Sequence, residues 1–160
     1  MIQWCLKLLT QYKNQDKNIH VFCLDFTSAL LANILHAQTT IEALEHDQQL
    51  VFETMSSLLG LINDNGSVKQ NSLPTSTLIH LLICLSYLSK ERFSKTIDDT
   101  GFVDQISQFV ETFSQKQIGE TDHESHDKKT ILDLCAHMFH PKDTTNANDV
   151  SATMEYNELK

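Results

Sequence analysis

Apolar residues recur along this chain at the three- and four-residue spacing of α-helices, in stretches whose centres repeat at similar intervals. The stretch centres fall near Leu31, Leu59, Leu82 and Phe109, so successive centres lie 28, 23 and 27 residues apart. The first and third stretches are apolar on nearly every face, whereas the second and fourth are apolar on one face only. Stacked helical repeats produce this alternation, because their innermost helices are covered by both adjacent repeats.

The composition also favours helices over strands. Only 4 Gly and 2 Pro occur in 160 residues, and a sandwich or barrel with many tight turns would normally need more of both. We therefore predict an all-α fold of the armadillo or HEAT type, that is, a fragment of an α-solenoid. A plain four-helix bundle is the alternative, but it predicts more equal amphipathicity among its helices.

The sequence divides into four predicted regions: helical repeats over residues 1–116, a polar acidic linker over 117–127, a terminal helix over 128–140, and a tail over 141–160. The acidic tail has too little apolar content to offset the entropy of ordering, so we expect it to be disordered. Within the repeats, the periodicity predicts helices over 2–13, 18–37, 48–63, 74–89 and 102–113, and a short helical turn around 41–44.

Charge and hydropathy exclude two classes of partner. The net charge is −9, and the longest basic run is Lys128-Lys129, so the clustered Lys and Arg that bind nucleic acid are missing. The longest apolar run, Leu78 to Leu88, is much shorter than the ~20 residues that span a membrane. The four cysteines lie far apart in apolar runs, which is typical of buried free thiols in a reducing compartment. We expect a soluble, cytoplasmic protein without membrane insertion.

Several segments resemble a known family. The segment Thr27-Ser28-Ala29-Leu30-Leu31-Ala32-Asn33-Ile34-Leu35 is similar to the inner helix of an armadillo repeat. A Trp-x-Leu-x-x-Leu helix from Trp4 precedes it, and Ser57-Leu58-Leu59 and a Gly-Phe-Val-Asp-x-Ile segment from Gly101 follow. Over residues 1–114 this order resembles the C-terminal armadillo region of the family of the LisH-domain-containing armadillo repeat-containing protein nine, found at the ciliary basal body and axoneme.

The resemblance implies a non-catalytic scaffold that binds ciliary or microtubule-associated proteins and acts in cilium assembly or ciliary signalling. It would place the protein in the cytoplasm at the cilium, basal body or cytoskeleton. The family's LisH motif and coiled coil do not occur in this sequence, and its dense acidic tail is replaced by a Thr- and Asn-rich one. The chain would then be a C-terminal fragment of such a protein.

Four side chains are candidates for a partner-binding groove, because they lie on the two helices that would line its inner surface: Asn33, His36, His80 and Tyr87. For this function we expect other proteins as partners and no cofactor.

A second interpretation is a small metal-binding regulator that uses four histidines near the C-terminus: His123, His126, His137 and His140. Cys135 lies among them, and zinc takes four such ligands tetrahedrally. Against it, no standard zinc spacing is matched, and a histidine near a helix C-terminus also interacts favourably with the helix dipole.

A third interpretation is a hydrolase with a cysteine nucleophile. Cys23 follows His20 by three residues and Cys84 follows His80 by four, so each pair could meet on one helix face. Neither pair has an orienting third group or a Gly-rich oxyanion loop nearby in the sequence.

Overall fold

The computed structural model describes residues 1–13, 19–63, 73–115 and 122–139. Every regular element in these ranges is helical. They are α1 (Ile2–Lys13), α2 (Ile19–His36), α3 (Gln38–Glu45), α4 (Gln48–Asn63), α5 (Thr75–Leu88), the 3-10 turn η2 (Glu91–Phe93), α6 (Ser94–Asp99), α7 (Phe102–Gln115) and α8 (Asp122–Phe139). The prediction of an all-α fold is therefore confirmed for the described part of the chain.

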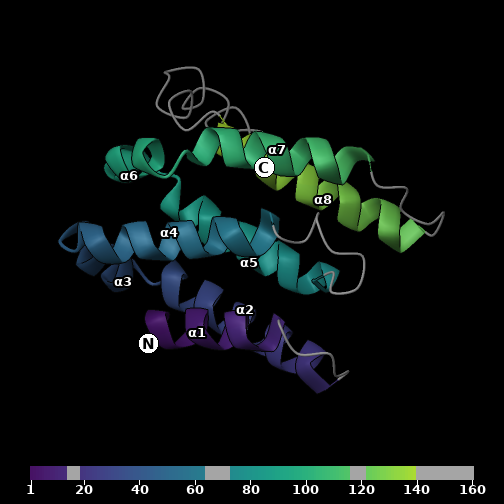
Figure 1. Ribbon diagram of the computed structural model, residues 1–160, viewed down its shortest axis with the longest axis horizontal. Helices are drawn as coiled ribbons and strands as arrows, with labels where there is room; N and C mark the ends of the chain where they lie inside the picture. The colour runs from purple at the N-terminus through teal and green to yellow at the C-terminus, as the bar shows by residue number, and fades with distance from the viewer. Residues whose placement is uncertain (14–18, 64–72, 116–121, 140–160) are drawn as a thin grey trace, which may run out of the picture.

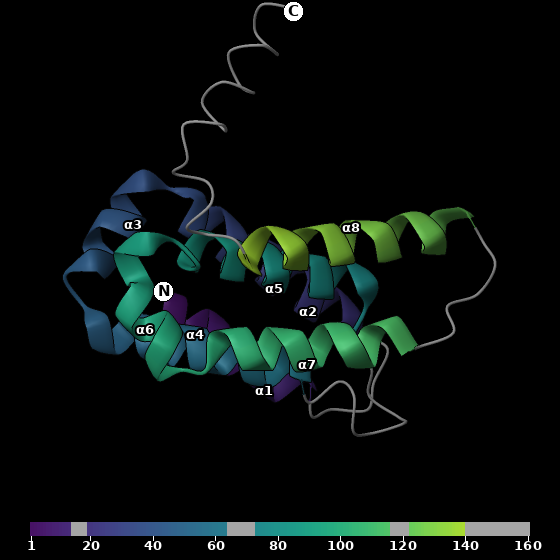
Figure 2. The same cartoon turned by 90° about the horizontal axis from the view of Figure 1, so that it is seen from above.

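The helices stack as three tiers. Figure 1 shows α1 and α2 in the first tier, α3, α4 and α5 in the second, and α6, α7 and α8 in the third. Seen from above, α2, α5 and α8 lie in one column and α1, α4 and α7 in the other (Figure 2). Extensive contacts join α1 to α2, α2 to α5, α5 to α8, α1 to α4 and α4 to α7. Among the described residues no extensive contact joins the first tier to the third, so the stack does not close on itself.

The one-sided helices pack as their sequence predicts. In α7 the buried side chains are Phe102, Ile106, Phe109 and Phe113, which recur at intervals of four, three and four residues and so line one face of the helix. Gly101 precedes this helix with a φ of +62°, a backbone conformation that glycine adopts without steric cost. The glycine therefore makes the sharp connection between α6 and α7.

Short helices, α3 and α6, precede the long helices of the second and third tiers and lie on the same side of the stack, at the left in Figure 1. Arg92 of η2 and Glu45 of α3 join them through a contact of 2.7 Å between Nη1 and Oε1. The α4 helix that follows begins with a side-chain cap, because the backbone N–H of Leu50 donates to Asp47 Oδ1 at 3.0 Å. Such a cap satisfies one of the backbone donors left free at a helix start.

The last helix differs from its prediction. It begins at Asp122, six residues before the predicted start at Lys128, and takes in part of the segment predicted as a linker over 117–127. Asp122 and Glu124 occupy its first turn, where acidic side chains interact favourably with the helix dipole. The predicted start relied on apolar spacing and overlooked this polar first turn. The predicted tail, 141–160, lies outside the described residues.

Candidate functional site

A shallow groove of about 330 Å³ lies between α2 and α5. All four residues predicted for partner binding line it: Asn33 and His36 from α2, and His80 and Tyr87 from α5. Its remaining walls are Ala29, Ala32 and Ile83. The structure thus brings together residues that lie about 50 positions apart in the sequence.

His36 and Tyr87 close one end of the groove as a pair. The distance between His36 Nδ1 and the Tyr87 hydroxyl oxygen is 2.9 Å, and the ring centroids lie 5.5 Å apart at an interplanar angle of 53°. A hydrogen bond and a tilted ring contact together hold both side chains in one orientation. The two rings therefore enter the groove wall as one fixed unit.

His80, further along α5, is fixed by α2. Its Nδ1 lies 3.1 Å from the fully buried Ser28 Oγ and 3.4 Å from Asp25 Oδ1. The Ser28 hydroxyl donates to the backbone carbonyl of Asp25 at 3.0 Å, so its oxygen is left to accept a hydrogen bond from the His80 ring. The opposite ring nitrogen, Nε2, takes part in neither contact.

This serine, histidine and aspartate set does not have the geometry of a catalytic triad. In a triad the acid and the nucleophile contact different ring nitrogens, so that one nitrogen takes the nucleophile's proton. Here Ser28 and Asp25 both contact Nδ1. Neither residue is a candidate on sequence grounds, because a serine inside an apolar helix gives no signal for a contact to another helix.

Asn33 is an exposed polar residue of the groove, as is His36. The Asn33 side chain makes no hydrogen bond to the described residues, and it lies beside the small side chains of Ala29 and Ala32. A side-chain amide offers a donor and an acceptor in the same arrangement as a peptide group. The groove can therefore pair with a polypeptide backbone that approaches closely over the two alanines.

A larger hollow, about 600 Å³, lies where α2 bends into α3. Residues from α1, α2, α3 and α4 line it, including Met1, Ile34, Ala43 and Leu50. Apart from the terminal amine its lining holds only threonine, glutamine and apolar side chains, so no charged side chains converge there. We place the candidate site in the smaller groove because fixed polar groups meet in it.

The buried thiols do not match an activated nucleophile. Burial raises the pKa of Cys84 and of Cys135 to about 12, and it also raises the pKa of Cys5. A reactive cysteine has the opposite shift. His80 faces Ser28 and Asp25 across the groove, so the proposed His80–Cys84 pair lacks its base. For the other proposed pair, the side chain of His20 lies outside the described residues.

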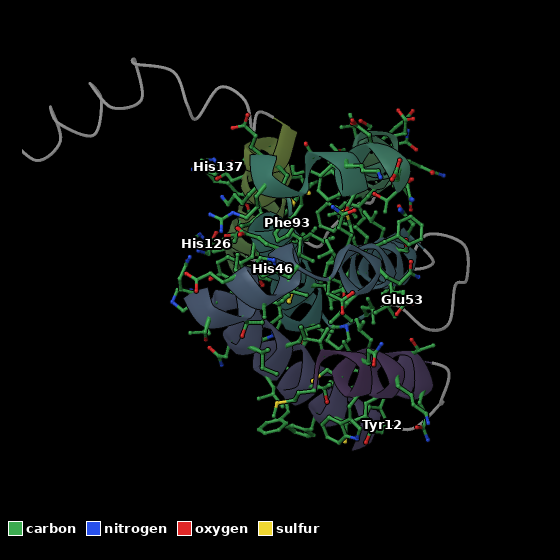
Figure 3. All side chains as sticks on the ribbon, turned by 90° about the vertical axis from the view of Figure 1, so that its left-hand side faces the viewer. Tyr12, His46, Glu53, Phe93, His126 and His137 are labelled. Atoms are coloured by element: carbon green, nitrogen blue, oxygen red, sulfur yellow. The ribbon has the colours of Figure 1, made fainter. Side chains whose placement is uncertain are left out.

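The histidines predicted as metal ligands are spread along α8. His123 and His137 are separated by 14 residues of one helix, which is about 21 Å at 1.5 Å per residue. Zinc holds its nitrogen ligands at roughly 2 Å, so one ion cannot bind both. Figure 3 shows His126 and His137 on the outer side of α8, at the opposite end of the stack from Tyr12 of α1.

Within the described residues no group of three or more His, Cys, Asp or Glu side chains is placed to hold a metal ion. His140 lies outside them. The predicted four-histidine set is therefore not assembled by the helix that carries three of its members.

Comparison of the chain with protein-family models, with curated proteins and with solved structures finds no match.

No single described helix is both long and apolar enough to cross a membrane. One bent pair, Val21–His36 with Gln38–Glu45 at 76°, reaches the required length and composition together.

Proposed function

We propose that this protein is a non-catalytic scaffold of armadillo-type helical repeats, and that its groove between α2 and α5 binds an extended segment of another protein. The observation that carries the proposal is the convergence of Asn33, His36, His80 and Tyr87 from two adjacent helices on one open groove. The groove has fixed polar groups and a small apolar floor, and it lacks an activated nucleophile. These properties suit binding better than catalysis.

The tiers support the repeat architecture. The second and third tiers each consist of one short helix followed by two long ones, and the first tier supplies two long helices in the same columns. The α3 helix begins at Gln38 and the α6 helix at Ser94, so the two starts lie 56 residues apart. This interval exceeds the ~40–47 residues of common armadillo and HEAT repeats. The excess corresponds to the segment between α4, which ends at Asn63, and α5, which begins at Thr75.

The chemistry of the groove suggests the nature of the bound segment. Asn33 can exchange two hydrogen bonds with one peptide group of an extended chain, and Nε2 of His80 can accept one more. The Asp25 carboxylate lies beside His80, with Oδ1 3.4 Å from Nδ1, and the whole chain carries a net charge of −9. Charge complementarity therefore favours a segment that contains Lys or Arg.

The proposal is tested by affinity capture with three forms of the full chain: wild type, the groove variant Asn33→Ala/His36→Ala, and the control Gln108→Ala/Thr112→Ala on the exposed side of α7. Both double variants replace exposed helical residues by a better helix former, so thermal unfolding should change little. We expect at least one protein to be captured equally by wild type and control but roughly tenfold less by the groove variant. A synthetic Lys- or Arg-containing peptide from that protein should compete.

If every captured protein binds the groove variant as well as the wild type, the groove is not the binding site.

Location in the cell is a separate proposal that rests on the family resemblance alone. A tagged full-length chain would then concentrate at the ciliary base or axoneme of ciliated cells, and a uniform distribution through the cytoplasm would contradict the ciliary role.

A further inference from the structure

Large apolar side chains are exposed mainly on the first tier. Of the seven large hydrophobic residues exposed in the described part of the chain, five belong to α1, α2 or the residue before them: Met1, Trp4, Val21, Phe22 and Phe26. Phe22 is 79% exposed, Phe26 73% and Trp4 57%. Contiguous exposed aromatic side chains usually mark an interaction surface.

These aromatic residues lie on the side of the first tier that faces away from the rest of the stack. Ser28 faces α5 through its contact with His80, and residues two apart on a helix point roughly 200° apart. Phe26 therefore points away from α5, and Phe22 lies one turn along the same face. On α1, Gln3 donates to Glu53 of α4, and Leu6 lines a hollow together with Ser57 of α4. Trp4 lies about a quarter-turn beyond Gln3.

We call the exposed set Trp4, Phe22 and Phe26 the end face. Because α1 and α2 pack against each other and are joined by five residues, their outward sides form one surface. The second tier uses its equivalent side to pack on the first tier. On the first tier this side is the end face, and no described residue covers it.

The opposite end of the stack is polar. The exposed side chains of α8 include Asp122, Glu124, Lys129 and Asp133, and Val103 is the one exposed large hydrophobic residue described in the third tier. Repeat stacks need polar outer faces at both ends. This stack has such a face at one end only.

Charge is distributed in the same unequal way. Residues 1–36 carry three Lys and two Asp, whereas the remainder of the chain carries nine Lys or Arg and nineteen Asp or Glu. Two copies that meet through their first tiers would keep their strongly acidic parts far apart, so that electrostatic repulsion is weakest in this arrangement.

We propose that the end face is a homodimer interface, in which two copies of this chain stack first tier against first tier about a twofold axis. The same residues are used on both copies, so the contact is self-complementary and closed. The resulting six-tier stack would have the polar third tier at each end. A head-to-tail contact would place aromatic rings against that polar face.

The exposed area is large enough for such a contact. Taking ~200 Å² for an aromatic side chain, the exposed fractions of the three rings leave roughly 400 Å² on each copy. A pair would bury about 800 Å² from these rings alone, and Met1, Val21 and neighbouring polar atoms would bring the total toward the ~1,000 Å² of a specific interface.

Sedimentation velocity of the full chain between about 1 and 200 µM tests the proposal. We expect the mass to rise from 18.2 kDa to twice that value and no further. The variant Phe22→Glu/Phe26→Glu should weaken self-association by roughly 100-fold or more, because it would bury charges without partners. The matched control Val103→Glu replaces an exposed apolar residue of the third tier and should dimerise like the wild type.

Trp4 provides a second measurement that needs no variant, because it is the one tryptophan of the chain. Its fluorescence emission should shift to shorter wavelength as concentration rises, in step with the mass. A monomer at every concentration, growth beyond the dimer, or a dimer that leaves Trp4 emission unchanged would each overturn the proposal.

Discussion

The helices α2 and α5 have the same sequence character and different surroundings. Both are apolar on nearly every face, and both belong to the same column of the stack (Figure 2). The α5 helix packs against α2 on one side and α8 on the other, and Leu81, Leu82 and Leu85 are fully buried. The α2 helix packs against α1 and α5, yet Phe22 and Phe26 stay mostly exposed.

This contrast shows what an all-round apolar pattern encodes. The pattern specifies a helix with neighbours on several sides, and in α5 the chain itself supplies them on two opposite sides. In α2 the side that carries Phe22 and Phe26 has no neighbouring helix among the described residues. An apolar helix at the end of a stack therefore points to a missing neighbour, which is the physical basis of the dimer proposed above.

The largest loss of folding stability is expected for a substitution in α5, in the middle of the stack. Leu85→Ala in α5 removes a fully buried side chain between two neighbouring helices and should lower the free energy of unfolding by about 2–5 kcal/mol. Urea titration followed by circular dichroism measures it. A loss of less than about 1 kcal/mol in the free energy of unfolding would contradict the burial of α5 between α2 and α8. The contrast between α2 and α5 would then be wrong.

Thiol labelling compares the same two helices without altering either. Burial raises the pKa of Cys84 in α5 to about 12, so at pH 8 about one thiol in 10⁴ is ionised. Cys23 in α2 is partly exposed. Iodoacetamide at pH 8 should modify Cys23 at least about 100-fold faster than Cys84, as followed by peptide mass spectrometry. In urea the two rates should converge, and equal rates without urea would contradict the buried position of α5.

Much of the fold could be predicted from the sequence. Apolar spacing places the helices 2–13 and 48–63 at their observed bounds, because a one-sided helix has one packing solution and polar turn residues at its ends. The start of α8 could not be predicted in this way. Its first turn is held by charge and backbone hydrogen bonds, and apolar spacing carries no information on either.

The groove residues could be predicted in part. Asn33, His36, His80 and Tyr87 stand out because they are polar on apolar helices, and the structure brings all four to one groove. The bond from His80 to Ser28 could not be predicted, since it depends on which faces of α2 and α5 meet. The exposure of Phe22 and Phe26 could not be predicted either. The sequence shows that their helix is apolar on nearly every face, but it does not show where the stack ends.

The smallest change in folding stability is expected for a substitution at the end face. Phe26→Ala at about 1 µM, where the dimer should dissociate, removes a side chain that is 73% exposed and should change the free energy of unfolding by less than about 0.5 kcal/mol. The higher helix propensity of alanine offsets part of the lost contact. Val103→Ala on α7 is the matched control. At about 200 µM the wild type should gain stability from association and Phe26→Ala should gain less. A loss of 2 kcal/mol or more at the low concentration would show that Phe26 is covered within a single folded chain, and α2 would then be enclosed as fully as α5.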